Sequence, residues 1–468
     1  MESTDVSNEN SGAGALSINP ATGAVIGRHP FHSAEDCDRI LARAAQSQAR
    51  WAASPSAQRA AAIGRIGETL RQKRESLAAL ITSEMGKPIS AARAEVEKCA
   101  QLCLWYAANE EKLLADERID TAGDGEAVVA FLPLGIVLGV MPWNFPFWQV
   151  LRAAIPIMLA GNGFLLKHAD NVQGCAAALE RVIAEAGVPE DLLAVVNVTR
   201  GDLPRIIADT RIAAATVTAG TAAGAAIAAD AGRNLKKTVL ELGGSDPFIV
   251  LADADVDHAA ATAVRARFQN AGQVCIAAKR IIVERGIADR FLASFVAGVK
   301  ALRVGDPAEE ATEMGPMARG RLRDELHGQI VASVARGAIL VLGGEVPDGP
   351  GFYYPPTILC GVTSDMPVYC EETFGPVAAI ILVDDADDAI RIANDSDFGL
   401  SGALWTRDMA RASALVRRIE TGAVYVNGMA ASDPRVPIGG IKRSGYGREL
   451  SHFGLREFCN AQLTWLRD

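Results

Sequence analysis

The chain has 468 residues, which is too long for one compact core and predicts two or three domains. Hydrophobic residues make up 49% and charged residues 22%, as in ordinary soluble globular proteins. The formal net charge of −10 argues against a nucleic-acid or anionic-membrane partner, because such partners are bound by basic surfaces.

The first stretch, MESTDVSNENSGAGALS, is polar and acidic and lacks the apolar core of a secretory signal, so we expect a disordered leader over residues 1–16. No apolar run reaches the ~20 residues that cross a bilayer. The eight cysteines are scattered, and the pair Cys99 and Cys103 falls in a helical pattern instead of a zinc-binding spacing. We therefore expect free thiols, no metal site and a cytoplasmic protein.

From about residue 33 to 115, apolar residues recur at three- and four-residue intervals, which predicts helices. Short apolar runs without alternation follow, separated by helical stretches of which the first starts near Phe147. These runs are typical of strands buried on both faces of a parallel sheet, and they cover 135–143, 163–169, 193–198 and 213–220. The alternation predicts a doubly wound, Rossmann-like α/β domain that binds a dinucleotide and comprises residues 17–116 and 135–242.

A second block of alternating strands and helices, residues 243–445, predicts another α/β domain. Two strand-like segments fit neither sheet, namely 117–134 and the C-terminal 446–468. Strands left over in this way are often used for pairing with a partner subunit.

The stretch VTAGTAAG (217–224) is the best candidate for a phosphate site. A strand runs into Gly220 and a helix begins at Thr221, so backbone amides at the helix start could hold a pyrophosphate. Lys167, at the end of another strand, could donate to ribose hydroxyls. The ordinary alternatives are a structural glycine and a solvent-facing lysine, and the chain has no G-x-G-x-x-G motif.

Three further residues could carry chemistry. Cys275 is either a small buried hydrophobe or a nucleophile, which would need a base and an oxyanion donor. Glu241, in LELGG, is either a salt-bridged residue at a strand end or a carboxylate whose apolar surroundings raise its pKa toward that of a general base. Asn144, in PWNFP, either caps the next helix or donates to an oxyanion.

The motifs PWNFP, LELGGSDPFIV, NAGQVCIAAKR, EETFGP and PIGGIKRSGYGRE occur in this order, and together they resemble those of the aldehyde dehydrogenase superfamily. The resemblance covers the chain from about residue 17. It implies that residues 243–445 form the catalytic domain and that 117–134 and 446–468 form an oligomerisation arm. It also implies a homodimer or homotetramer that oxidises an aldehyde to a carboxylic acid.

The resemblance assigns catalytic roles. Cys275 matches the nucleophile, which would form a thiohemiacetal and then a thioester. The Asn144 amide and the Cys275 backbone N–H match the oxyanion hole, in which one donor is typically worth ~10²–10³ in rate. Glu241 matches the base that activates water to hydrolyse the thioester, and Glu449 matches a structural glutamate that supports the site.

The resemblance also implies a nicotinamide dinucleotide cofactor, with Glu372 on the nicotinamide ribose and Phe374 against the ring. The positions that match the family's cofactor contacts are Trp143, Lys167, Gly220 with the neighbouring Thr221, Leu242, Glu372 and Phe374.

The chain departs from the family pattern at two cofactor contacts. Ala219 and Gly220 stand where Gly-Ser is common, so the pyrophosphate contact there relies on backbone alone. KHAD stands where Lys-Pro is common and brings Asp170 close to the adenosine ribose. A carboxylate accepts from a 2′-OH and repels a 2′-phosphate, so we expect NAD to be preferred, with NADP possible.

Within the superfamily, LLKHADN, ARFQNAGQVC and KRSGYGRELSHFGLREFCN resemble bacterial succinate-semialdehyde dehydrogenases. Arg152 matches an arginine that binds the far carboxylate of such a substrate. Gln269 stands where some relatives carry a second arginine, and Ser432 could add a hydroxyl. Succinate semialdehyde is therefore the expected substrate. The alternatives are another aliphatic aldehyde or semialdehyde, a CoA-acylating enzyme, which Glu241 argues against, or a non-catalytic relative.

Overall fold

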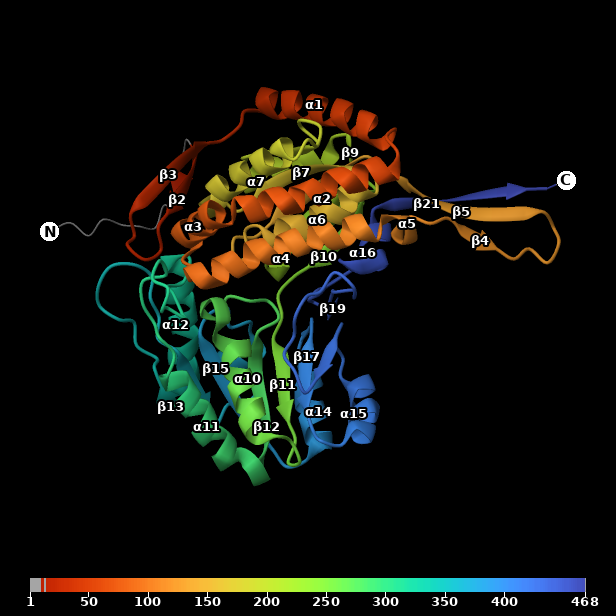
Figure 1. Ribbon diagram of the computed structural model, residues 1–468. Coiled ribbons are helices and arrows are strands. Elements are labelled where there is room, and N and C mark those ends of the chain that lie inside the picture. Colours follow the sequence, from red (N-terminus) through yellow and green to blue (C-terminus); the bar gives the residue numbers. More distant parts are fainter. Residues whose placement is uncertain (1–9, 12–13, 468) are drawn as a thin grey trace.

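The computed structural model describes residues 10–11 and 14–467 (Figure 1). The chain forms two lobes, one above the other in Figure 1, and a narrow arm that extends from the upper lobe. Within the described residues, no helix is both long enough and apolar enough to cross a membrane.

The upper lobe is built on a sheet that has six strands within the described residues, in the order β20-β10-β9-β6-β7-β8. Strands β6 to β10 are parallel to their neighbours, and β20 is antiparallel at the edge. The bounds are β6 Ile136–Met141, β7 Gly163–His168, β8 Leu193–Val195, β9 Ile212–Thr218, β10 Lys237–Glu241 and β20 Gly445–Tyr446. This arrangement has the doubly wound form that the apolar runs predict.

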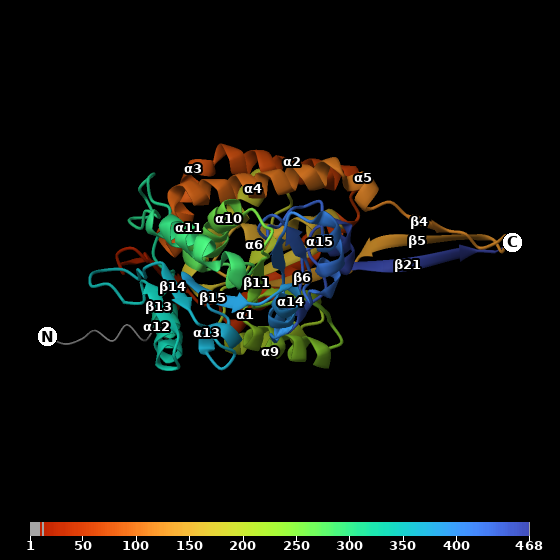
Figure 2. The same cartoon turned by 90° about the horizontal axis from the view of Figure 1, so that it is seen from below.

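Helices cover both faces of this sheet (Figure 2). Along β6, Val137 packs into the core that α2, α4, α6 and α7 share, while its neighbours Ile136 and Leu138 pack into the core with α1, α8 and α9. Because these strands are buried on both faces, apolar residues follow one another along them, and the sequence shows continuous apolar runs. The helices of this lobe are α1 Ala34–Ala52, α2 Ser56–Gln72, α3 Arg74–Met85, α4 Ile89–Ala108, α5 Glu110–Leu113, α6 Trp148–Leu159, α7 Gln173–Glu185, α8 Leu203–Ala208, α9 Thr221–Arg233 and α16 Ser451–Glu457.

The lower lobe has a second sheet, with seven strands in the described chain and the order β13-β14-β15-β12-β11-β17-β18. Its strands are β11 Asp246–Val250, β12 Ala278–Glu284, β13 Ile339–Leu342, β14 Thr357–Cys360, β15 Val377–Val383, β17 Gly402–Trp405 and β18 Val424–Val426. Its helices are α10 Val256–Phe268, α11 Ala288–Lys300, α12 Gly320–Ala335, α13 Pro367–Cys370, α14 Ala386–Asn394 and α15 Met409–Leu415. A short pair, β16 Phe398–Gly399 and β19 Ile441–Lys442, lies beside it.

The two sheets meet where the chain passes from β10 to β11. Strand β10 ends at Glu241, and β11 starts at Asp246, which pairs with Ala278 at the start of β12. The carboxyl ends of the upper strands therefore face the amino ends of the lower ones. Residues just after β10 and just before β12 come together at the junction of the lobes, and Cys275 is among them.

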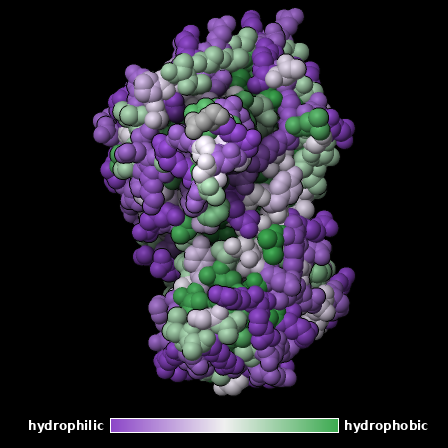
Figure 3. Space-filling view, turned by 90° about the vertical axis from the view of Figure 1, so that its right-hand side faces the viewer, coloured by the Kyte–Doolittle hydropathy of each residue, from purple (hydrophilic) through white to green (hydrophobic). Residues whose placement is uncertain are grey.

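The arm is a sheet of β4 Glu117–Ile119, β5 Glu126–Pro133 and β21 Cys459–Leu466. The C-terminal part of the predicted arm, 446–468, needs correction, because β20 pairs with β10 and α16 packs on α6, so the arm strand starts only at Cys459. On β21, Leu463, Trp465 and Leu466 are 55%, 43% and 63% exposed. Figure 3, which faces the arm's end, shows hydrophobic and hydrophilic side chains mixed on this side.

The predicted disordered leader also needs correction. Residues 10–11 form β1 Asn10–Ser11, which pairs with β2 Gly14–Ile18, and β2 pairs with β3 Val25–Pro30. In β2 the Ser17 hydroxyl donates to Glu84 Oε1 at 2.6 Å, which ties this sheet to α3. The rest of the predicted leader, residues 1–9 and 12–13, lies outside the described residues.

Candidate active site

Cys275 follows a loop with an unusual backbone. Asn270, Ala271 and Gly272 have φ angles of 53°, 52° and 70°, so three consecutive residues are left-handed. Residues other than glycine rarely adopt this backbone conformation, which costs such a residue of order 1–3 kcal/mol. At Gly272 a Cβ would lie 2.2 Å from the Gly375 carbonyl oxygen, so this position requires glycine. Strain of this kind is typical of functional sites.

Buried side chains hold this loop in place. Arg267, on α10, is fully buried and donates to the carbonyls of Gly272 at 3.3 Å and Thr373 at 3.0 Å, and also to those of Gly375 and Val377. The guanidinium therefore connects the loop before Cys275 to the 373–377 segment. Its hydrogen bonds compensate for the conformational cost of the left-handed residues.

Asn144 lies against the same loop. Its Nδ2 donates to the Gln273 carbonyl at 3.0 Å, and Asn270 Nδ2 donates to the Asn144 carbonyl at 2.9 Å. Asn144 is 3% exposed. An amide nitrogen carries two hydrogens, so the second hydrogen of Nδ2 can still be donated near Cys275. Asn144 is not a helix cap, because α6 begins at Trp148 with Phe147 in the cap position and the backbone N–H groups of both donate to Glu95 Oε1.

Glu241, at the end of β10, shares a buried cluster with Arg152 and Glu449. Arg152 Nη2 lies 3.9 Å from Glu241 Oε2, and Arg152 Nε forms an ion pair with Glu449. All three side chains are at most 3% exposed. Glu241 Oε1 is buried and has no hydrogen-bond partner within the described chain. One carboxylate oxygen is therefore available to another group, such as a water molecule.

Burial sets the protonation behaviour of these groups. The pKa of Glu241 is raised above its usual range, mainly by loss of solvent and further by Glu449, although Arg152 opposes the change. Burial also raises the pKa of the Cys275 thiol to about 11, while Arg152 and Lys279 act in the opposite direction. Cys275 is nevertheless partly exposed and forms no disulfide. The site therefore pairs an accessible thiol with a carboxylate that exchanges protons near neutral pH.

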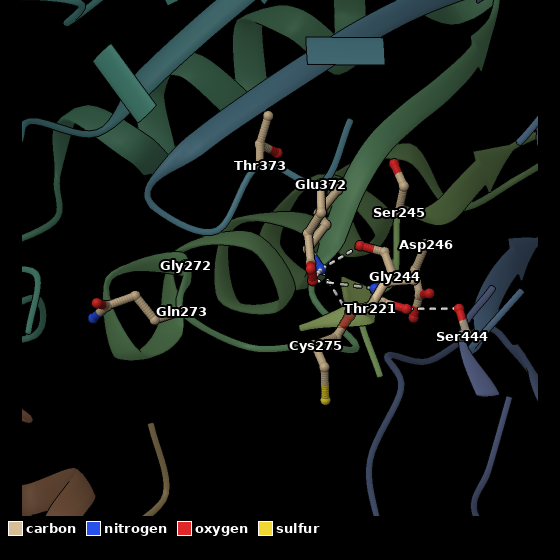
Figure 4. Close-up of polar contacts among 12 residues, drawn as sticks. Thr221, Gly244, Ser245, Asp246, Gly272, Gln273, Cys275, Glu372, Thr373 and Ser444 are labelled. Carbon is tan, nitrogen blue, oxygen red and sulfur yellow. Dashed lines mark hydrogen bonds and ion pairs between the residues drawn. The ribbon is translucent and has the colours of Figure 1, made fainter. Parts of the chain in front are cut away.

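A second ion pair, of buried Lys279 and partly exposed Glu372, lies against the Cys275 backbone. Lys279 Nζ donates to the Gly244 carbonyl at 2.5 Å, the Cys275 carbonyl at 2.8 Å and Glu372 Oε1 at 2.7 Å. Glu372 Oε1 also accepts from the Gly244 N–H at 3.1 Å. Figure 4 shows Glu372 above Gly244, with the Cys275 sulfur pointing away from this group. Lys279 thus fixes the backbone of the nucleophile and leaves its sulfur free.

A cleft in the upper lobe lies at the carboxyl ends of its strands. Four predicted cofactor residues line it, namely Trp143, Lys167, Asp170 and Gly220. Gly220 precedes α9, whose first turn has no side-chain cap, and a Cβ on Gly220 would meet nothing within 4 Å. Backbone N–H groups at this helix start are therefore accessible to an anion, and the residues present fit a dinucleotide pyrophosphate.

The other predicted cofactor residues are not among those that line this cleft. Phe374 lies across from Trp143, with ring centroids 5.8 Å apart and an edge-to-face angle of 87°. Thr221 is the first residue of α9. Leu242 is buried against Gly224, where a Cβ would lie 2.2 Å from a Leu242 methyl carbon. Glu372 is the partner of Lys279.

The predicted substrate residues are placed differently from expectation. Arg152 is 2% exposed and its Nε forms an ion pair with Glu449, so a buried anion already matches its charge, and its contact with a substrate carboxylate stays a prediction. Gln269 is partly exposed at the end of α10. Ser432 Oγ accepts from Lys98 Nζ at 2.7 Å.

Sequence reasoning missed Lys98, Arg267 and Lys279. Lysine and arginine are common on helix surfaces, so Lys98 and Arg267 gave no signal. Lys279 did give one, because it is the second residue of the apolar strand β12, and a lysine in a buried strand is rare without a partner. Within the described residues there is no cluster of three or more metal-ligating side chains.

Comparisons with known proteins agree with this geometry. The sequence pattern of the aldehyde dehydrogenase family matches residues 7–464. The succinate semialdehyde dehydrogenase [NAD(P)+] Sad of Escherichia coli K12 is 52% identical over 96% of this chain and 97% of its own length. The succinate-semialdehyde dehydrogenase [NADP(+)] of Mycobacterium avium is 47% identical over 96% of each chain.

A solved structure, succinic semialdehyde dehydrogenase from Streptococcus pyogenes in complex with NADP+, superposes with a TM-score of 0.95 at 36% identity. The superposition covers 97% of this chain and all of that one (100%). The chain therefore belongs to the aldehyde dehydrogenase family. The family and the fold class that the motifs predicted are confirmed.

Proposed function

We propose that this protein oxidises succinate semialdehyde to succinate with a nicotinamide dinucleotide as hydride acceptor. The observation that carries the proposal is the environment of Cys275, a partly exposed thiol beside a buried amide and near a buried carboxylate of raised pKa. The substrate follows from the relatives, which are named for succinate semialdehyde at 52% and 47% identity over nearly their whole length.

In the first step, the Cys275 sulfur attacks the aldehyde carbon, and a C–S bond forms as the carbonyl π bond breaks. The thiol loses its proton before or during the attack, because only the thiolate is nucleophilic. The raised pKa of this thiol means that a base must take the proton. Solvent that reaches the partly exposed thiol accepts this proton, so the acylation step does not require Glu241.

The aldehyde oxygen becomes an oxyanion in the thiohemiacetal. The free hydrogen of Asn144 Nδ2 and the Cys275 backbone N–H are the donors placed to stabilise it. The nucleophile loop forms one hydrogen bond with the Asn144 side chain and one with its backbone carbonyl. The donor therefore needs no rearrangement when charge develops on the oxygen. When the oxyanion collapses, the carbon loses a hydride and becomes a thioester.

A bound nicotinamide dinucleotide supplies the ring carbon that accepts this hydride. In the upper-lobe cleft, the start of α9 would hold the pyrophosphate, Lys167 and Asp170 would hold the adenosine ribose, and Trp143 and Phe374 would contact the nicotinamide end. Trp143 is followed by Asn144, whose side chain donates to the loop that carries Cys275.

Glu241 then takes a proton from water, and the hydroxide formed attacks the thioester carbon. The C–S bond breaks, the Cys275 thiolate leaves, and the carboxylic acid is released. Glu241 Oε1 has no hydrogen-bond partner within the described chain, so it can accept that proton directly. Arg152 and Glu449 position Glu241.

We further propose that NAD is preferred over NADP, although NADP is used. Asp170 accepts from Lys167 Nζ at 2.6 Å, so the lysine charge is already matched by a carboxylate. A 2′-phosphate would meet Asp170 and would have to compete for Lys167, whereas a 2′-OH can donate to the carboxylate. We also propose a homodimer or homotetramer that assembles through the arm.

The direct test is Cys275→Ser, with the formation of reduced nicotinamide followed by absorbance. We expect succinate semialdehyde turnover to fall at least about 10³-fold, because a serine hydroxyl is a much weaker acid and nucleophile than a cysteine thiol. Cys370→Ser is the matched control, since Cys370 is an exposed free cysteine, and it should keep full activity. Retained turnover in the Cys275 variant would refute the proposal.

A further inference from the structure

Lys98 lies on the face of α4 that packs against the start of α6. One turn before it, Glu95 Oε1 accepts the backbone N–H groups of Phe147 and Trp148 at 2.9 and 3.0 Å. Because residues three apart share a face of a helix, Lys98 faces the same end of α6 as Glu95. This end follows Asn144 by four residues, so Lys98 lies next to the segment that carries the oxyanion donor.

The contacts of Lys98 come from both lobes. Its Nζ donates to Ser432 Oγ at 2.7 Å and lies 4.0 Å from the centroid of the Trp148 ring. Ser432 belongs to the lower lobe, in the loop after β18. The ammonium group therefore lies at the junction of the lobes between α4, α6 and that loop, and it is partly exposed.

The negative charges near Lys98 already have partners. Glu95 and Asp433 both act on it electrostatically, but Glu95 pairs with Lys87 and Asp433 pairs with Arg435 at 2.7 Å. Within the described chain, Lys98 itself forms no ion pair with a carboxylate. The Lys98 ammonium is mostly removed from solvent and contacts a hydroxyl and an aromatic ring. An anionic group of a ligand would therefore stabilise its charge.

Lys98 does not line the dinucleotide cleft. The residues that line the dinucleotide cleft come from the strand ends of the upper lobe and from α9, and neither Lys98, Trp148 nor Ser432 is among them. Hydride transfer requires the nicotinamide on one side of the reacting carbon, so the rest of the aldehyde extends to the other side.

We propose that Lys98 Nζ and Ser432 Oγ bind the far carboxylate of the aldehyde substrate and so select a semialdehyde over a neutral aldehyde. This inference rests on the proposed function. It assigns to Lys98 the role that the sequence suggested for Arg152, whose charge is taken by Glu449. The Ser432 hydroxyl can receive the lysine's hydrogen bond and donate its own hydrogen to a carboxylate oxygen.

The test compares succinate semialdehyde with butanal, a neutral aldehyde of the same carbon count. In Lys98→Met, the ratio of kcat/KM for the semialdehyde to that for butanal should fall about 10–100-fold, through KM more than kcat. Ser432→Ala should lower the ratio less, about three- to tenfold. Lys98→Arg should restore most of the preference. Lys112→Met removes an exposed lysine from α5 in the same lobe and should leave the ratio unchanged.

A pH profile gives a readout that misfolding would not imitate. Burial and Arg152 lower the pKa of Lys98 to about 8, against the opposing effects of Cys99, Glu95 and Asp433. The positive charge is present below that pKa and is lost above it. The wild-type preference for the semialdehyde should therefore decline as pH rises through about 8, and it should be flat with pH in Lys98→Met.

The outcomes separate this inference from the proposed function. If the wild-type enzyme does not prefer the semialdehyde over butanal, the proposed substrate is wrong, and the role of Lys98 fails with it. If the wild type prefers the semialdehyde and Lys98→Met keeps that preference, the inference alone is overturned. Equal losses on both aldehydes in Lys98→Met would also overturn it, because they would show a structural role.

Discussion

Two carboxylates near Cys275 are held in different ways. Glu372 Oε1 accepts from Lys279 Nζ at 2.7 Å and from the Gly244 N–H at 3.1 Å, so its charge is matched at short range. Glu241 lies 3.9 Å from its nearest cation, Arg152, which is bound more closely to Glu449. The first arrangement fixes an anion, and the second leaves a carboxylate able to gain and lose a proton. The comparison therefore favours Glu372 as the glutamate that supports the site and Glu241 as the one that reacts.

The largest effect is expected from Glu241→Gln, which keeps the shape of the side chain and removes the base. Steady-state kcat should fall about 10²–10⁴-fold, because water can no longer be deprotonated at the thioester. The measurement is the rate of cofactor reduction with saturating succinate semialdehyde. If Glu372→Gln lowered kcat as much as Glu241→Gln, the two carboxylates would not be distinguished as proposed.

The Glu241 pKa also sets the sign of the pH dependence. Its pKa is raised, so the carboxylate that accepts the water proton is present only above that pKa. Thioester hydrolysis in the wild type should therefore accelerate as pH rises and level off above the pKa. The rise should be lost in Glu241→Gln.

Lys279→Met tests the role of Glu372, the carboxylate that Lys279 holds. The substitution leaves Glu372 and two carbonyl groups without their donor, and we expect a loss of about 3 kcal/mol in the free energy of unfolding. Chemical denaturation measures it. Lys300→Met, at the exposed end of α11, serves as the control and should change stability by less than about 0.5 kcal/mol. A loss in Lys279→Met no greater than in the control would show that the Lys279–Glu372 pair does not hold the site.

A smaller effect is expected at the more exposed pair of Lys167 and Asp170, whose side chains are 7% and 23% exposed. Asp170→Asn removes the charge that opposes a 2′-phosphate and frees Lys167. The ratio of kcat/KM for NADP to that for NAD should rise about tenfold, or ~1.4 kcal/mol. Asp116→Asn, on the exposed surface, is the matched control. An unchanged ratio in Asp170→Asn would argue against the role of this carboxylate.

The parts of the fold that depend on local pattern could be predicted. The apolar runs of β6, β7 and β9 reflect burial on both faces of one sheet, and the strand ends brought Lys167 and Gly220 together as parallel topology requires. The carboxyl ends of parallel strands lie at the same edge of a sheet, so the residues that follow them can be predicted to lie together even when no contact between them is known.

Pairings across long separations could not be read in this way. Arg152 was assigned to substrate because nothing near it in sequence reveals that Glu449 neutralises it. Lys98 was overlooked because its partner, Ser432, is 334 residues away. The predicted leader, residues 1–16, has a similar explanation, because β1 pairs with β2 and β2 pairs with β3, and such pairing is not visible in a polar stretch of sequence.

The central claim is that an acyl group is carried on Cys275 and released by Glu241. Glu241→Gln mixed with succinate semialdehyde and NAD should reduce about one equivalent of cofactor per subunit and then stall. Intact-mass measurement and peptide mapping of that sample should find one succinyl group on Cys275. An unmodified Cys275 after the burst, or a succinyl group on another residue, would contradict the account.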